Sequence, residues 1–70
     1  MSLLQWRTAT DLHLIAEIIP DPTEPGRHLD RLTDVRVAAH GLVLYVDTVR
    51  EVFAIPVASV VYLSYTPSGA

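Results

Sequence analysis

The side chains that most often perform chemistry are few in this chain of 70 residues, and they are widely spaced. The three histidines, His13, His28 and His40, lie 15 and 12 positions apart, so no zinc-type pair such as His-x3-His is present. Asp11, His13 and Glu17 share one face of an expected strand and could meet a metal ion. Closed metal sites need three or four converging ligands, so we interpret these residues as ordinary surface groups. A small metal-binding protein or enzyme built on His13, His28 and Asp11 is the third choice of function.

Nucleophilic and phosphate chemistry have equally little support. The chain has no cysteine, and no serine stands in a Gly-x-Ser-x-Gly context. The three glycines are isolated from one another, so there is no glycine-rich phosphate loop. The Ser59 side chain is expected to hydrogen-bond to backbone groups of the bend that precedes the last strand. We therefore predict a protein that is not an enzyme and that needs no cofactor or metal.

The composition indicates one small domain, residues 1–70, with more apolar surface than it can easily hide. Hydrophobic residues make up 50% of the chain, the mean hydropathy is +0.32 and the net charge is −3. The longest uncharged apolar segment, residues 52–65, contains Pro56 and is shorter than the roughly 20 residues of a membrane helix. The lack of cysteine and of a visible targeting segment favours the cytoplasm. The scattered arginines and the acidic balance argue against a nucleic-acid partner.

Period-two alternation of apolar and polar residues predicts strands rather than helices. The expected strands cover residues 12–19, 33–39, 42–46, 52–55 and 60–65, while residues 2–8 fit either a short helix or a strand. Three prolines and a glycine in residues 20–26 predict a long loop over residues 20–32, a secondary candidate for function. Five short strands with this rhythm predict an all-β fold, a small, strongly bent antiparallel barrel with a long Pro-rich loop after the first strand.

Residues 42–46 and 52–63 are apolar on both faces, which a one-layer barrel in water does not need. A second copy or another protein could cover the outer face, and the alternative is that the N-terminal segment folds over it. We predict a non-catalytic protein–protein interaction or assembly module that self-associates or docks a partner through apolar strand edges. The interface residues expected on this basis are Val52, Phe53, Ile55, Tyr62 and Tyr65, with Trp6 from the N-terminal arm.

The run Gly-Leu-Val-Leu-Tyr-Val-Asp at 41–47, followed by Val-Phe-Ala-Ile-Pro-Val-Ala-Ser-Val-Val-Tyr-Leu at 52–63, resembles the second half of Sm-like barrels. The resemblance implies a hairpin, a short bend and a closing strand that pairs with the next subunit of a ring. RNA-chaperone members carry a Lys-His pair after an aromatic residue, where this chain has Phe53 followed by Ala54 and Ile55. The Arg-Gly pair of archaeal and eukaryotic members is also missing from this stretch. A nucleic-acid-binding Sm-like barrel, which would need Arg36 and Arg50 to converge, is therefore the second choice.

Overall fold

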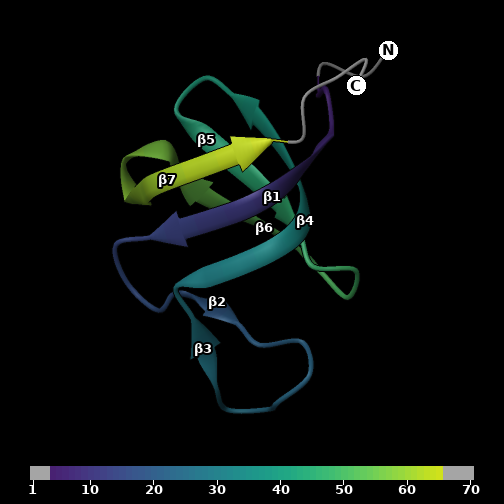
Figure 1. The fold of residues 1–70 in the computed structure, drawn as a ribbon, viewed down its shortest axis with the longest axis vertical. Helices are drawn as coiled ribbons and strands as arrows, with labels where there is room; N and C mark the ends of the chain where they lie inside the picture. Colours follow the sequence, from purple (N-terminus) through teal and green to yellow (C-terminus); the bar gives the residue numbers. More distant parts are fainter. Residues whose placement is uncertain (1–3, 66–70) are drawn as a thin grey trace.

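The computed structural model describes residues 4–65, and the regular elements within them are strands and one 3-10 turn. The strands are β1 (Arg7–Leu14), β2 (Ile19–Pro20), β3 (His28–Leu29), β4 (Arg31–His40), β5 (Val43–Asp47), β6 (Val52–Pro56) and β7 (Val60–Tyr65). The 3-10 turn η1 (Val57–Ser59) joins β6 to β7 (Figure 1). The described part of the chain is all-β, as the period-two pattern predicts.

Five strands form one antiparallel sheet in the order β6-β5-β4-β1-β7 (Figure 1). Strands β4, β5 and β6 follow one another through short turns, whereas β7 returns to pair with β1. Gly41 has φ +61° in the turn between β4 and β5, a backbone conformation that glycine adopts without steric cost. Strands β2 and β3 form a separate two-stranded ladder that closes the base of the proline-rich loop.

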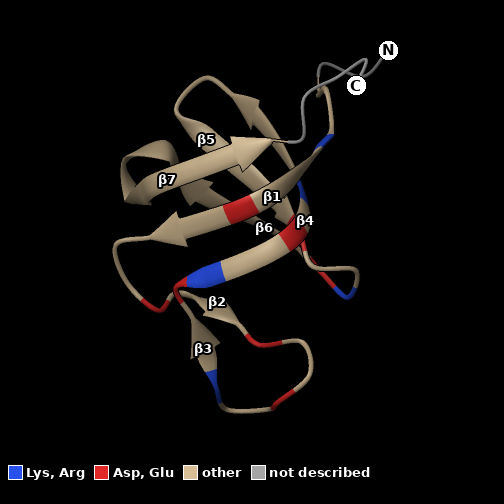
Figure 2. Cartoon of the chain, viewed as in Figure 1, with Lys and Arg blue, Asp and Glu red and all other residues tan. Residues whose placement is uncertain are grey.

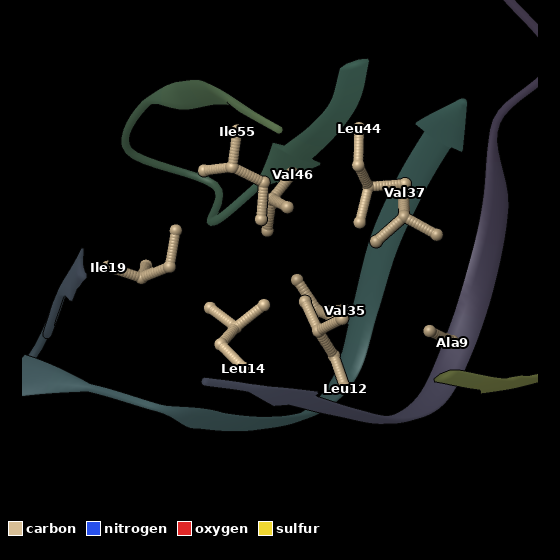
Figure 3. Packing of buried hydrophobic residues seen from close by; sticks show 9 residues of the cluster. All are labelled: Ala9, Leu12, Leu14, Ile19, Val35, Val37, Leu44, Val46 and Ile55. Atoms are coloured by element: carbon tan, nitrogen blue, oxygen red, sulfur yellow. The ribbon is translucent and has the colours of Figure 1, made fainter. Parts of the chain in front are cut away.

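The core is one cluster of aliphatic side chains that alternate along the strands of the bent sheet. Figure 3 shows side chains of β5 and β6 facing those of β1, so the sheet folds around its own inner face. Burying a side chain of this size contributes about 1.5–3 kcal/mol to folding, so the cluster is the main source of stability. Its members are Ala9, Leu12, Leu14, Ile19, Val35, Val37, Leu44, Val46 and Ile55.

The first strand lies earlier in the chain than residues 12–19, so that prediction is wrong at both ends. The chain turns away from β7 after Leu14, where the N–H of Ile15 donates to the carbonyl of Ser59 at 2.9 Å. Apolar alternation continues to Ile19 because Ile19 returns to the core from β2, not because the strand continues. Of the ambiguous residues 2–8, Arg7 and Thr8 belong to β1, and residues 2 and 3 lie outside the described part of the chain.

The sheet is not closed, so the structure does not confirm a barrel. Within residues 4–65, neither β6 nor β7 pairs with a strand on its outer side. The long loop after the first strand is present, but it contains the β2–β3 ladder. This ladder was not predicted, because the prolines in the segment argue against strands. The bend before the last strand is confirmed as η1, where the Ser59 hydroxyl donates to the carbonyl of Pro56 at 2.6 Å.

Candidate functional site

The outer edges of the sheet are formed by β6 and β7, and neither strand carries a charged side chain. All the Arg, Asp and Glu residues of the chain precede Val52. Figure 2 shows the consequence in space, since acidic and basic residues mark β1, β4 and the loops while β7 has none. The two edge strands therefore carry no charged side chain of their own, although the guanidinium of Arg7 on β1 lies 4.0 Å from the ring centre of Tyr65 at the end of β7.

Exposed apolar side chains accompany both edges. Val52 on β6 is 55% exposed, and Val61 and Tyr62 on β7 are 65% and 51% exposed. On β6 the cause is simple alternation, because Phe53 and Ile55 face inward and leave Val52 on the other side. Single exposed apolar residues are common, and five others lie in loops and turns of this chain, namely Ile15, Ile18, Leu42, Val49 and Val57. Val52, Val61 and Tyr62 differ from them in lying on strands that end the sheet.

On β7 two consecutive residues are exposed, which strict alternation does not allow. The register with β1 places Tyr62 opposite His13 and Val60 opposite Leu14, so Val61 has no partner on β1. An extra residue of this kind disturbs the ladder and reorients the side chains beside it. Sequence reasoning missed Val61 because this register shift depends on pairing with a strand about 50 positions away.

The structure separates the predicted interface residues into two groups. Val52 and Tyr62 are well exposed, as a contact surface requires. Ile55 is 7% exposed and belongs to the core of the single chain, so it is not available to a partner. Phe53 and Tyr65 are partly buried against the same core.

Trp6 lies away from this edge surface, over the outer side of β4. Its ring centre is 5.3 Å from the Cζ atom of Arg36, a cation–π arrangement. Val35 and Val37 face the core, so Arg36 between them faces outward. The contact found for Trp6 is therefore with β4, and it does not test the alternative interpretation, in which the N-terminal segment covers the outer face of residues 42–46 and 52–63.

Polar contacts hold β7 in place against β1. The hydroxyls of Thr10 and Ser64 lie 2.6 Å apart, and the Thr10 hydroxyl also reaches the Ser64 carbonyl at 3.2 Å. Further along the same pair of strands, the rings of His13 and Tyr62 are 5.2 Å apart and tilted by 49°. The edge strand is therefore fixed on its inner side, so the position of its outer side is also defined.

The proline-rich loop has the opposite character, because polar contacts organise it. The N–H and hydroxyl of Thr23 both donate to Asp21, and these hydrogen bonds hold the pKa of the Asp21 carboxyl below its ordinary value. A hydrogen bond to Glu24 raises the pKa of Arg27. The Arg50 guanidinium donates to the carbonyl of Pro22 at 3.1 Å and so ties the β5–β6 turn to this loop.

The groups needed for nucleic-acid binding do not form a free basic patch. The Arg36 guanidinium lies 3.8 Å from the carboxylate of Asp47, and Arg50 is engaged with Pro22 beside the acidic Glu51. For metal binding, residues 4–65 contain no group of three His, Cys, Asp or Glu side chains placed to hold an ion. His13 contacts Tyr62, and His28 lies on the separate ladder β3.

Among residues 4–65 there is no helix of the length and apolar character needed to cross a membrane. Comparisons with protein-family models, with curated proteins and with solved structures find no match to this chain.

Proposed function

We propose that this chain is a non-catalytic assembly module that self-associates, or docks a second protein, through the outer edges of β6 and β7. One observation carries the proposal, namely that both edge strands of the sheet lack charged side chains. Sheet proteins that remain monomeric usually protect their edges with charged side chains, prolines, bulges or a covering segment, because an open edge is a template for another strand.

Several features protect parts of these two edges. Pro56, which lacks an N–H group, ends β6, and the unpaired Val61 lies near the beginning of β7. At the other end of β7 the register shifts again between Ala9 and Asp11, and the Arg7 guanidinium lies over Tyr65. This leaves residues 52–55 and 62–64 as edge segments without charged side chains of their own. These segments are the part of the surface that we assign to the partner.

The two edges differ from each other, which determines the kind of assembly. Pairing β6 of one copy with β7 of the next joins unlike surfaces, so repetition gives a closed ring or an open filament. The resemblance to Sm-like barrels implies the same head-to-tail pairing. In this proposal the β6 and β7 edges are satisfied between subunits, and Val52 and Tyr62 supply cross-strand apolar contacts.

Light scattering after size exclusion, over a series of protein concentrations, tests the proposal directly. The wild type is expected to have a discrete mass that is a multiple of 7.7 kDa and that persists on dilution. The variants V52K and Y62K place an ammonium group on each edge in turn, and each is expected to elute as a monomer. The matched control is V49K, which adds the same charge at a position that is 95% exposed in the β5–β6 turn.

A wild type that is monomeric at every concentration would overturn self-association. Docking of a second protein would then be the remaining form of the proposal, and V52K and Y62K must both abolish it. Dissociation by V49K to the same extent as by the edge variants would show that added charge, rather than the strand edges, controls the assembly.

A further inference from the structure

A shallow groove lies between the proline-rich loop and the β5–β6 turn, apart from the exposed side chains of β7. It consists of two hollows of about 260 and 150 Å³, and both are lined by Pro22 and Thr48. The larger hollow is completed by the other loop prolines, the start of β6 and the turn, and the smaller one by residues 32–35 of β4 and the tip of the turn. Because they share these two lining residues, the hollows lie side by side, and together they are called the groove.

The larger hollow has apolar as well as polar lining residues. Pro20, Pro22 and Pro25 line it together with Phe53, which is partly buried against the core. Proline fixes its own φ angle, and the bond from Arg50 to the Pro22 carbonyl joins the two walls. A ligand would therefore meet a surface that is already formed, which lowers the entropic cost of binding.

The rim of the groove is acidic. Asp21, Asp34, Asp47 and Glu51 line the two hollows, against Arg50 as the one cation among the lining residues. Asp21 lies 3.9 Å from Arg27, and Asp47 lies 3.8 Å from Arg36, so these two carboxylates are partly neutralised.

The other two carboxylates on the rim, Glu51 and Asp34, are exposed. Neither forms an ion pair with any residue in the described part of the chain. One lines the larger hollow and the other lines the smaller one. Glu51 shares the larger hollow with the Arg50 guanidinium, whereas no cation among residues 4–65 lines the smaller hollow, where a cationic ligand would meet Asp34.

We propose that this groove binds an extended peptide segment of a partner protein in which arginine side chains alternate with apolar residues. Each hollow is smaller than the roughly 300–1,000 Å³ of a typical small-molecule pocket, so it fits a side chain rather than a whole cofactor. The proline rings and Phe53 offer an apolar contact, and Glu51 and Asp34 attract the guanidinium groups. Nucleic acid is excluded by the sign of the charge.

Chemical-shift titration of the ¹⁵N-labelled chain with a blocked hexapeptide, Arg-Pro repeated three times, tests this assignment. Saturable shifts are expected at the amides of residues 48–51 and 21–27, with a Kd on the order of 1 mM or tighter. The same peptide with Glu in place of Arg is expected to cause no shifts. Spermidine, which supplies charge without apolar contacts, is expected to bind at least several-fold more weakly.

Variants with one charge removed separate groove binding from general attraction to an acidic protein. E51Q and D34N are each expected to weaken peptide binding several-fold, and both sites are exposed, so the fold is retained. Asn also tolerates the positive φ of 51° found at Asp34. The control D11N removes the same charge from the outer side of β1 and is expected to leave the Kd unchanged. Equal weakening by D11N, equal binding of spermidine, or shifts that lie outside the groove would each overturn the proposal.

Discussion

The proline-rich loop and the edge strands β6 and β7 all lie at the surface of the molecule, but different contacts hold them in place. The loop is ordered by polar contacts, with Asp21 accepting from Thr23 and Arg50 donating to the carbonyl of Pro22. Strands β6 and β7 are held by their ladders with β5 and β1 and by the apolar contacts of Ile55 and Leu63, and the Thr10–Ser64 hydroxyl pair adds a polar contact on β7. Charged residues mark the loop and also β1 and β4, whereas β7 has none (Figure 2).

This difference has a functional meaning. A loop that is held by several hydrogen bonds can keep a groove on the surface accessible to a ligand. The backbone N–H and C=O groups on the outer side of an edge strand bind water, and a strand of another chain can replace that water. The two proposals follow this division, with peptide binding at the loop and assembly at the edges.

The largest expected effect comes from Ile19, because it connects the two regions. Ile19 lies on β2 at the base of the loop, yet it is fully buried in the core with the strands of the main sheet. I19A is expected to destabilise the whole domain by about 2–5 kcal/mol through lost burial and the resulting cavity. Urea unfolding followed by far-UV circular dichroism and by Trp6 fluorescence measures it. A loss below about 1 kcal/mol would show that the loop is ordered independently of the sheet.

A smaller and opposite effect is expected at Val49, at the tip of the β5–β6 turn. This residue has φ +78°, a conformation that is unfavourable for a β-branched side chain, and it is 95% exposed. V49N is expected to stabilise the domain by about 1 kcal/mol, because Asn tolerates this conformation and no buried contact is lost. An increase in the urea midpoint without a change in slope would confirm it. A decrease would mean that Val49 makes an apolar contact that offsets the strain.

The smallest expected effect concerns pH and is confined to the loop. The pKa of Asp21 is lowered in the folded chain from its ordinary value of 3.8, chiefly by hydrogen bonds from Thr23. Its contribution to stability is therefore complete well above pH 3.8 and declines as the pH falls through the lowered folded pKa.

The measurement for this prediction is the melting temperature of the wild type and of D21N between neutral and acidic pH. The difference between the two proteins is expected to be largest near neutral pH and to shrink at acidic pH. A constant difference would show that the carboxylate charge of Asp21 does not contribute to the order of the loop.

Local pattern was sufficient for much of the fold. Residues 33–39, 42–46, 52–55 and 60–65 were predicted as strands, and the structure places β4, β5, β6 and β7 there to within two residues at each end. Alternation alone specifies such strands because inward and outward side chains change at every position. The prediction from alternation was wrong between Leu14 and Ile19. There the chain bends and a second short strand brings Ile19 back to the core, so the apolar pattern looks like that of a continuing strand.

The candidate surface was predictable only in part, for a related reason. Of the residues predicted for the interface, Val52 and Tyr62 are exposed and Ile55 is buried, because a strand that is apolar on both faces does not reveal which face is inside. Val61 was missed because its exposure depends on the shifted register between β1 and β7.

The sequence by itself determined the all-β character, the position of the proline-rich loop and the absence of charge after Glu51, since each depends on residue types that act locally. The tertiary structure alone decided that β6 and β7 end the sheet, that Ile19 joins the loop to the core, and that Pro22 and Thr48 line a common groove. These features depend on which distant segments pair, and pairing is fixed by the packing of the whole chain rather than by any short stretch of it.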